Sequence, residues 1–123
     1  MKLPAYQIDT FTDKVFLGNP AVVCPLESWL PTDIMQQIAM ENSVAETAFF
    51  IMLDKGFAIR WFTPEIEMDL CEHATLAAAH VLFRHLNYTQ PSIQFKSNSG
   101  ELTVTIDLLL LTLNLPSRKP EVS

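Results

Sequence analysis

The sequence predicts an α+β domain in which a sheet is wrapped around one apolar helix, and three patterns lead to this prediction. Residues 73–86 carry Ala and Leu on nearly every face, which is typical of a buried helix. Two segments with the composition of β-strands, 46–63 and 93–106, are each divided by a turn signal and therefore predict two hairpins. We expect the helix to lie in the middle of the domain, because its alanines allow strands to approach closely.

The chain is predicted to open with two strands, at residues 4–11 and 21–24, joined through the turn-forming Gly18-Asn19-Pro20. A short surface helix is expected at 32–41, with Thr32 as its cap and Asp33 in its first turn. These segments precede the first hairpin.

In the first hairpin, strands at 46–53 and 57–63 flank Asp54-Lys55-Gly56 and should pair antiparallel. The second hairpin follows the apolar helix and turns at residues 97–100, with one face buried and one exposed to water. Residues 108–115 predict a last strand.

Length and composition fit one domain. The chain has 123 residues, of which 49% are hydrophobic and 18% charged, so it can bury a core without disulfide bonds. We assign residues 1–116 to the domain and 117–123 to a polar tail. Eight basic against fourteen acidic residues give a net charge of −6, which argues against binding to nucleic acid.

The sequence also bears on compartment. Its longest apolar stretch is far shorter than the roughly 20 residues of a spanning helix, and no secretory signal is visible, so we expect a cytoplasmic protein with no membrane contact. Cys24 and Cys71 are interpreted as thiols rather than a disulfide, and two cysteines at this separation make no zinc site.

Three polar segments could carry chemistry: the turn at 18–20, the loop and strand start at 42–47, and the helix entrance at 70–75. A helix start offers free N–H groups and the positive end of the dipole, which suit a substrate carboxylate or a developing enolate. Each segment also has a simpler interpretation. The first is a plain reverse turn, Glu46 a solvated charge, His73 and Thr75 partners of first-turn N–H groups, and Cys71 a small buried hydrophobe.

Taken together, the ordered motifs are more specific. They resemble the phenazine-biosynthesis (PhzF-like) isomerase family over about residues 5–116. This resemblance implies the diaminopimelate-epimerase-like fold, in which each of two lobes is a mixed, mostly antiparallel sheet curled into a barrel around a central helix. The active site of that family lies between the lobes. The matching motifs are G-N-P at 18–20, E-T-A-F-F at 46–50, R-W-F-T-P at 60–64, L-C-E-H-A-T-L-A-A-A-H at 70–80 and S-G-E-L at 99–102.

The resemblance implies an isomerase that needs no cofactor or metal and moves a proton to or from carbon of a small anionic, carboxylate-bearing metabolite. Glu46 matches the residue that carries the proton, and His73 matches the pocket histidine at the helix start. Asn19 matches a substrate contact. Such chemistry needs a carboxylate whose pKa is lifted by burial, and donors where negative charge develops. Substrate binding is assigned to Asn19, Glu72, Ala74 and Thr75.

The chain departs from the family pattern at two positions of the site and in length. Glu72 stands where the family has Gly, which adds bulk and negative charge at the anion-binding helix start, and Ala45 replaces a usual Ser. Family members are about twice as long, and their second lobe contributes an Asp and a Ser or Thr that have no match here. The chain therefore resembles the N-terminal lobe alone.

Three functional hypotheses follow. In the first, a second copy of the chain or a separate second-lobe polypeptide completes the active site, so that the chain forms a dimer or larger assembly through its exposed apolar face. In the second, the lobe is a truncated, non-catalytic module for binding or oligomerisation. In the third, Cys71 is the base, as in amino-acid racemases of this fold, although the partner base on the opposite face is then missing.

Overall fold

The structure, a computed structural model, describes residues 5–8, 21–42, 46–107 and 110–114. The predicted turn at 18–20, with Asn19, and the predicted tail at 117–123 lie outside the described residues. The described residues form two helices and eight strands. These are β1 (Tyr6–Ile8), β2 (Ala21–Leu26), α1 (Thr32–Asn42), β3 (Glu46–Met52), β4 (Phe57–Phe62), β5 (Glu67–Met68), α2 (Glu72–Arg84), β6 (Ser92–Ser97), β7 (Gly100–Asp107) and β8 (Leu110–Asn114).

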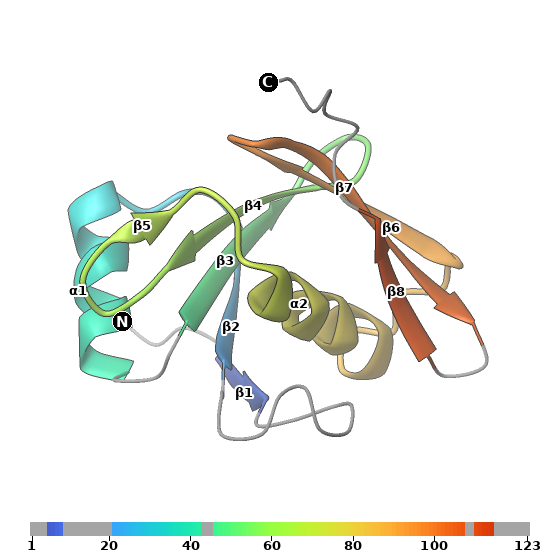
Figure 1. Cartoon of the computed structure of the whole chain (residues 1–123), viewed down its shortest axis with the longest axis horizontal. Coiled ribbons are helices and arrows are strands. Elements are labelled where there is room, and N and C mark those ends of the chain that lie inside the picture. The colour runs from blue at the N-terminus through green and yellow to red at the C-terminus, as the bar shows by residue number, and fades with distance from the viewer. Residues whose placement is uncertain (1–4, 9–20, 43–45, 108–109, 115–123) are drawn as a thin grey trace, which may run out of the picture.

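The strands form one mixed sheet in the order β1-β2-β3-β4-β6-β7-β8, with the short β5 paired to β4 (Figure 1). Two pairs, β2 with β3 and β4 with β6, are parallel, and the other pairs are antiparallel. The predicted α+β class and the mixed, mostly antiparallel sheet are therefore present.

The expected barrel is not supported. Along the described strands the sheet is an open path that ends at β1 on one side and at β8 on the other. The helix α2 lies between the two halves of this curved sheet, and it contacts β2 and β3 as well as β8 (Figure 1). Because an apolar helix occupies the space between the halves, the sheet surrounds α2 without its end strands pairing.

Both predicted hairpins are confirmed. In the first, β3 and β4 pair antiparallel, with Met52 opposite Phe57 at the turn and Ala48 opposite Trp61. In the second, β6 and β7 pair antiparallel from Ser97 opposite Gly100. The predicted opening pair is also present, because β1 and β2 are antiparallel. Local turn chemistry thus identified the strands that are neighbours in sequence.

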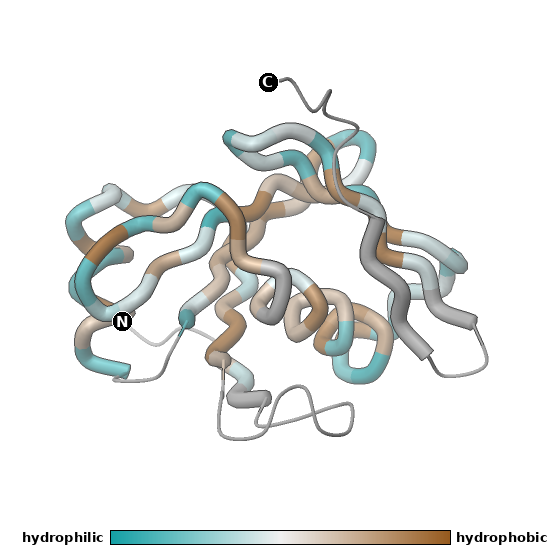
Figure 2. The backbone as a smooth tube through the Cα atoms, viewed as in Figure 1, coloured by the Kyte–Doolittle hydropathy of each residue, from teal (hydrophilic) through white to brown (hydrophobic). Residues whose placement is uncertain are grey.

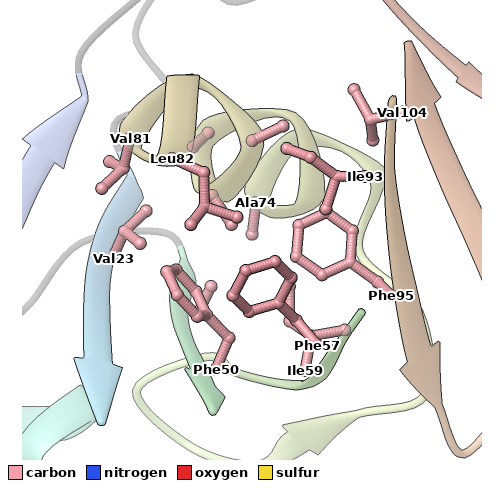
Figure 3. Close-up of a cluster of buried hydrophobic side chains, with 14 of the residues drawn as sticks. Val23, Phe50, Phe57, Ile59, Ala74, Val81, Leu82, Ile93, Phe95 and Val104 are labelled. Atoms are coloured by element: carbon pink, nitrogen blue, oxygen red, sulfur yellow. The ribbon is translucent and has the colours of Figure 1, made fainter. Parts of the chain in front are cut away.

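The central part of the sheet is covered on both faces, so alternate residues of a strand enter different cores. Val23 of β2 and Ala48 of β3 belong to the larger cluster, which contains the buried residues of α2 and is called here the α2-side core (Figure 3). Val22 and Phe49 belong to a smaller cluster with Met35 of α1, called here the α1-side core. Figure 2 shows hydrophobic residues gathered along α2 and the strands around it.

The predicted surface helix is confirmed as α1, but its predicted cap is wrong. Thr32 is already the first helical residue, and the backbone N–H groups of Ile34 and Met35 donate to the carbonyl oxygen of Pro31 at 3.0 and 3.1 Å. The Thr32 hydroxyl instead accepts a hydrogen bond from Arg60 Nη2 at 3.2 Å. Because a long-range partner occupies the hydroxyl, it serves to fasten α1 to β4.

The predicted apolar helix is confirmed as α2. Its alanines at 74, 77, 78 and 79 are fully buried, as expected for a helix approached by strands from several sides. Within the described part of the chain, neither helix is both long and apolar enough to span a bilayer.

Candidate active site

Glu46 is the first residue of β3, and the sheet register determines which way its side chain points. It lies opposite Ala21 in the parallel β2–β3 pair. Side chains two residues apart on a strand share a face, and Ala48 and Phe50 enter the α2-side core. Glu46 therefore faces α2. The residue is half-buried and its Oε1 oxygen is buried, which does not fit a fully solvated strand-end charge.

The start of α2 is a helix N-terminus without a side-chain cap. Cys71 precedes the helix in an extended conformation, and its side chain makes no capping hydrogen bond. The first-turn N–H groups, of residues 72, 73 and 74, have no acceptor within a regular helix. Glu72 and His73 contribute helical backbone to this turn, and their side chains lie outside the described ones.

Thr75 is fully buried, and its hydroxyl has a structural partner. Its Oγ1 donates to the carbonyl oxygen of Cys71 at 2.7 Å, and its backbone N–H donates to the same oxygen at 3.1 Å. The hydroxyl therefore closes the first turn of α2. Its predicted role in binding substrate stays a prediction, as does that of Ala74, whose side chain is fully buried.

The two cysteines lie on opposite sides of the sheet and are not joined by a disulfide. Cys71 is 9% exposed in the α2-side core, whereas Cys24 belongs to the α1-side core. Burial raises the pKa of Cys24 to about 11, so its thiol is an inert apolar group at neutral pH. Because they face different cores, the two cysteines cannot form one two-base site. The role of Cys71 as a base stays a prediction.

The side chain of Glu46 and the start of α2 lie on the same side of the sheet. Ala21, the register partner of Glu46, packs in the same core as Cys71 and Ala74. A carboxylate and a set of helix-start N–H groups on one side of a sheet suit removal of a proton from carbon and stabilisation of the resulting charge. Among the described residues, no three His, Cys, Asp or Glu side chains gather as metal ligands.

Comparison with known proteins identifies the family. The sequence profile described as phenazine biosynthesis-like protein, PhzC-PhzF, matches residues 8–121. The chain belongs to this family. An uncharacterized isomerase of Pseudomonas aeruginosa is 46% identical over 121 residues, which cover 98% of this chain and 47% of that protein. An uncharacterized isomerase of Halalkalibacterium halodurans is 43% identical over 123 residues, 98% of this chain and 46% of that protein.

Solved structures of the PhzF family share the fold. A PhzF-family protein of Enterococcus faecalis is 47% identical and matches with a TM-score of 0.86 over 99% of this chain and 48% of that chain. A predicted epimerase of P. aeruginosa is 26% identical, with a TM-score of 0.71 over 84% of this chain and 38% of that one. The chain thus spans about half the length of the PhzF-family relatives that it matches.

Sequence reasoning assigned no role to two side chains near Glu46, although Asn42 lies in the polar segment 42–47 that it singled out. The Asn42 amide, at the end of α1, donates to Thr47 Oγ1 at 3.2 Å and so ties α1 to the beginning of β3. Trp61 of β4 lies opposite Ala48 in the α2-side core. The place of Trp61 could not be recognised from the motifs, because the R-W-F-T-P string does not say which face its tryptophan occupies. Only the pairing register places it beside Glu46.

Proposed function

We propose that this chain contributes one half of an isomerase or epimerase active site that transfers a proton at carbon of a small carboxylate, with Glu46 as the base. The observation that carries the proposal is the placement of Glu46, half-buried on the α2 face of the sheet. Relatives named isomerases support the reaction class.

In this reaction the Glu46 carboxylate takes the proton as the carbon–hydrogen bond breaks. The electron pair left on carbon delocalises into the adjoining unsaturated or carboxyl group. In an isomerisation, Glu46 then returns the proton to another carbon. In an epimerisation, Glu46 keeps that proton and a second acid, for which His73 is proposed below, gives a proton to the opposite face of the same carbon. A positioned base of this kind contributes roughly 10²–10⁴-fold to a rate.

The start of α2 would hold the substrate carboxylate and the charge that develops on it. The N–H groups of residues 72–74 and the helix dipole favour an anion there. His73, in this first turn, is proposed as the second acid–base group because imidazole exchanges protons near neutral pH. Glu72 adds a negative charge at the same turn, so Glu72→Gly should tighten carboxylate binding.

A second chain is proposed to complete the site, either another copy or a separate polypeptide that supplies a second lobe. This chain spans about half of the two isomerases compared above, and the other half of those proteins is the model for the second lobe. Mass in solution, measured by light scattering, should therefore correspond to a dimer or a larger assembly. A stable monomer with isomerase activity would contradict this part of the proposal.

The reaction is tested by deuterium exchange. The purified chain, together with any polypeptide that co-purifies with it, is incubated in D₂O with vinylacetate and, separately, with a mixture of L-amino acids, and deuterium at carbon is followed by proton NMR. Vinylacetate reports a shift of a double bond, and the amino acids report exchange at the α-carbon. We expect time-dependent incorporation into one of these classes that depends on the protein.

The matched variants are Glu46→Gln and Glu65→Gln. Both remove one carboxylate, but Glu65 is exposed in the turn between β4 and β5. Glu46→Gln should abolish exchange while the circular dichroism spectrum stays unchanged, and Glu65→Gln should exchange like the parent. Exchange that survives in Glu46→Gln would disprove the role of Glu46. No exchange with a folded, assembled parent would favour the module without catalysis.

A further inference from the structure

The indole N–H of Trp61 is a buried donor with no partner among the described residues. The side chain is 1% exposed, and its Nε1 atom is buried without a hydrogen-bond acceptor in range. Buried polar groups in native proteins are nearly always hydrogen-bonded, because an unpaired one loses its bonds to water without replacement. A buried donor of this kind therefore calls for a specific explanation.

The sheet register places Trp61 next to Glu46. Trp61 lies directly opposite Ala48, and both enter the α2-side core. Glu46 precedes Ala48 by two residues, so it is the diagonal neighbour of Trp61 on the same face. Diagonal neighbours on antiparallel strands lie roughly 7–8 Å apart, which aromatic and long side chains can bridge.

The other buried polar side chains point elsewhere or are engaged. Thr47 alternates with Glu46 and Ala48, so it lies on the opposite face of β3, where it accepts the hydrogen bond from Asn42. Thr75, fully buried, donates to the Cys71 carbonyl. Glu46 Oε1 is buried on the face that Trp61 occupies. A carboxylate oxygen has two lone pairs and is the strongest acceptor available there.

We propose that the Trp61 indole N–H donates a hydrogen bond to the Glu46 carboxylate and positions it for proton transfer. The positioning role rests on the proposed function of Glu46, whereas the hydrogen bond itself does not. Hydrogen bonds of catalytic groups are often long in the absence of substrate and shorten in its complex. Trp61 is thus a positioning residue that acts through Glu46.

The contact is tested by NMR on the intact chain labelled with ¹⁵N-tryptophan. The chain has two tryptophans, so the spectrum contains two indole signals, and Trp29→Phe assigns them. Trp29 packs against Arg60 in the chain and serves as an internal control. We expect the Trp61 indole proton signal to move upfield in Glu46→Gln, which replaces the charged acceptor with a neutral one. It should move further upfield in Glu46→Ala, which removes the acceptor altogether. The Trp29 signal should stay in place.

The positioning role is tested by Trp61→Phe, which keeps an aromatic ring but removes the N–H group. Deuterium exchange should fall by about tenfold, the effect expected of one lost hydrogen bond to a charged group, whereas Trp29→Phe should stay within about twofold of the parent. The NMR comparison needs no change at Trp61, so it remains decisive if Trp61→Phe fails to fold.

The outcomes separate this inference from the proposed function. A Trp61 signal that is identical in the parent, Glu46→Gln and Glu46→Ala overturns the hydrogen bond, whatever the exchange rates are. Exchange that is equal in Trp61→Phe and the parent overturns the positioning role. A Trp61 signal that responds to Glu46, in a protein that exchanges none of the carbon acids, supports the hydrogen bond and overturns only the proposed reaction.

Discussion

Arg60 of β4 holds Glu67 of β5 in a two-point ion pair. Nε donates to Oε2 and Nη2 donates to Oε1, each at 2.7 Å. The guanidinium also lies 5.5 Å from the centre of the Trp29 ring and donates to Thr32 of α1. Hydrogen bonding to Glu67 raises the pKa of Arg60, so the guanidinium stays protonated. One side chain thereby connects β5, α1 and β4.

This geometry predicts that Arg60→Lys destabilises the fold, because an ammonium group cannot reproduce two parallel bonds and a stacked plane. Both side chains are about a quarter exposed, so solvent screens the pair and we expect a loss of only about 1 kcal/mol in the free energy of unfolding. Urea denaturation measures it. Arg84→Lys, at an exposed position of α2, is the matched control, and equal losses in the two variants would contradict the prediction.

Gly56 is predicted to be the least replaceable residue of the first hairpin. It has φ = +83°, and a Cβ added there would lie 2.6 Å from the carbonyl oxygen of Gln94. Gly56→Ala combines left-handed strain with a backbone clash between the β3–β4 turn and β6, so the free energy of unfolding should fall by about 2 kcal/mol or more. Lys55→Ala, at the exposed neighbouring position, should change it little. A similar urea midpoint for both variants would show that the backbone relaxes freely.

The sequence predictions were accurate where the interacting segments are close together in the chain, and they failed where the segments are far apart. The Asp54-Lys55-Gly56 signal joins strands that are adjacent in the chain, so it predicted both the turn and the β3–β4 pairing. The parallel pairing of β4 with β6 joins segments separated by α2, and no local signal encodes it. The expected barrel failed for the same reason, since closure depends on whether β1 and β8 meet across a helix.

The candidate site shows the same difference between what local sequence predicts and what depends on long-range pairing. Glu46 and the start of α2 were chosen as candidates from residue types and from the resemblance to a family. The face that Glu46 occupies depends on the register of β3 with β2, and the residues by themselves favoured a solvated charge. Trp61 looks like any core aromatic residue in the sequence, and its unpaired N–H becomes visible only once its surroundings are placed.

Thr75 provides a test of how the first turn of α2 is held. Thr75→Val keeps the shape of the side chain but leaves the Cys71 carbonyl without the hydroxyl bond at 2.7 Å. We expect a loss of about 1 kcal/mol in the free energy of unfolding, the usual contribution of one hydrogen bond. Thr75→Ser keeps the hydroxyl, so its loss of unfolding free energy should be smaller and should come only from the missing methyl group. If Thr75→Val were as stable as the parent, the bond would not secure the turn.

The lowered pKa of His80 predicts how the stability of the fold depends on pH. Burial in the α2 region lowers the pKa of His80 below its ordinary 6.5, and the nearby Arg84 and His85 lower it further. The unfolded chain therefore binds a proton at His80 more readily than the folded chain does. This contribution to stability is complete above the unfolded pKa of about 6.5 and is lost as the pH falls through the lower pKa of the folded protein.

The matched variant for this prediction is His80→Asn, which cannot titrate. The parent should lose unfolding free energy between about pH 7.5 and pH 5, and His80→Asn should lose less over the same interval, because one proton-linked group is gone. The His80 and His85 rings are 5.9 Å apart, so His85→Asn should also raise the pKa of His80 by removing a neighbouring charge. Urea denaturation at each pH gives the slopes, and parallel slopes for the parent and His80→Asn would show that His80 does not govern acid sensitivity.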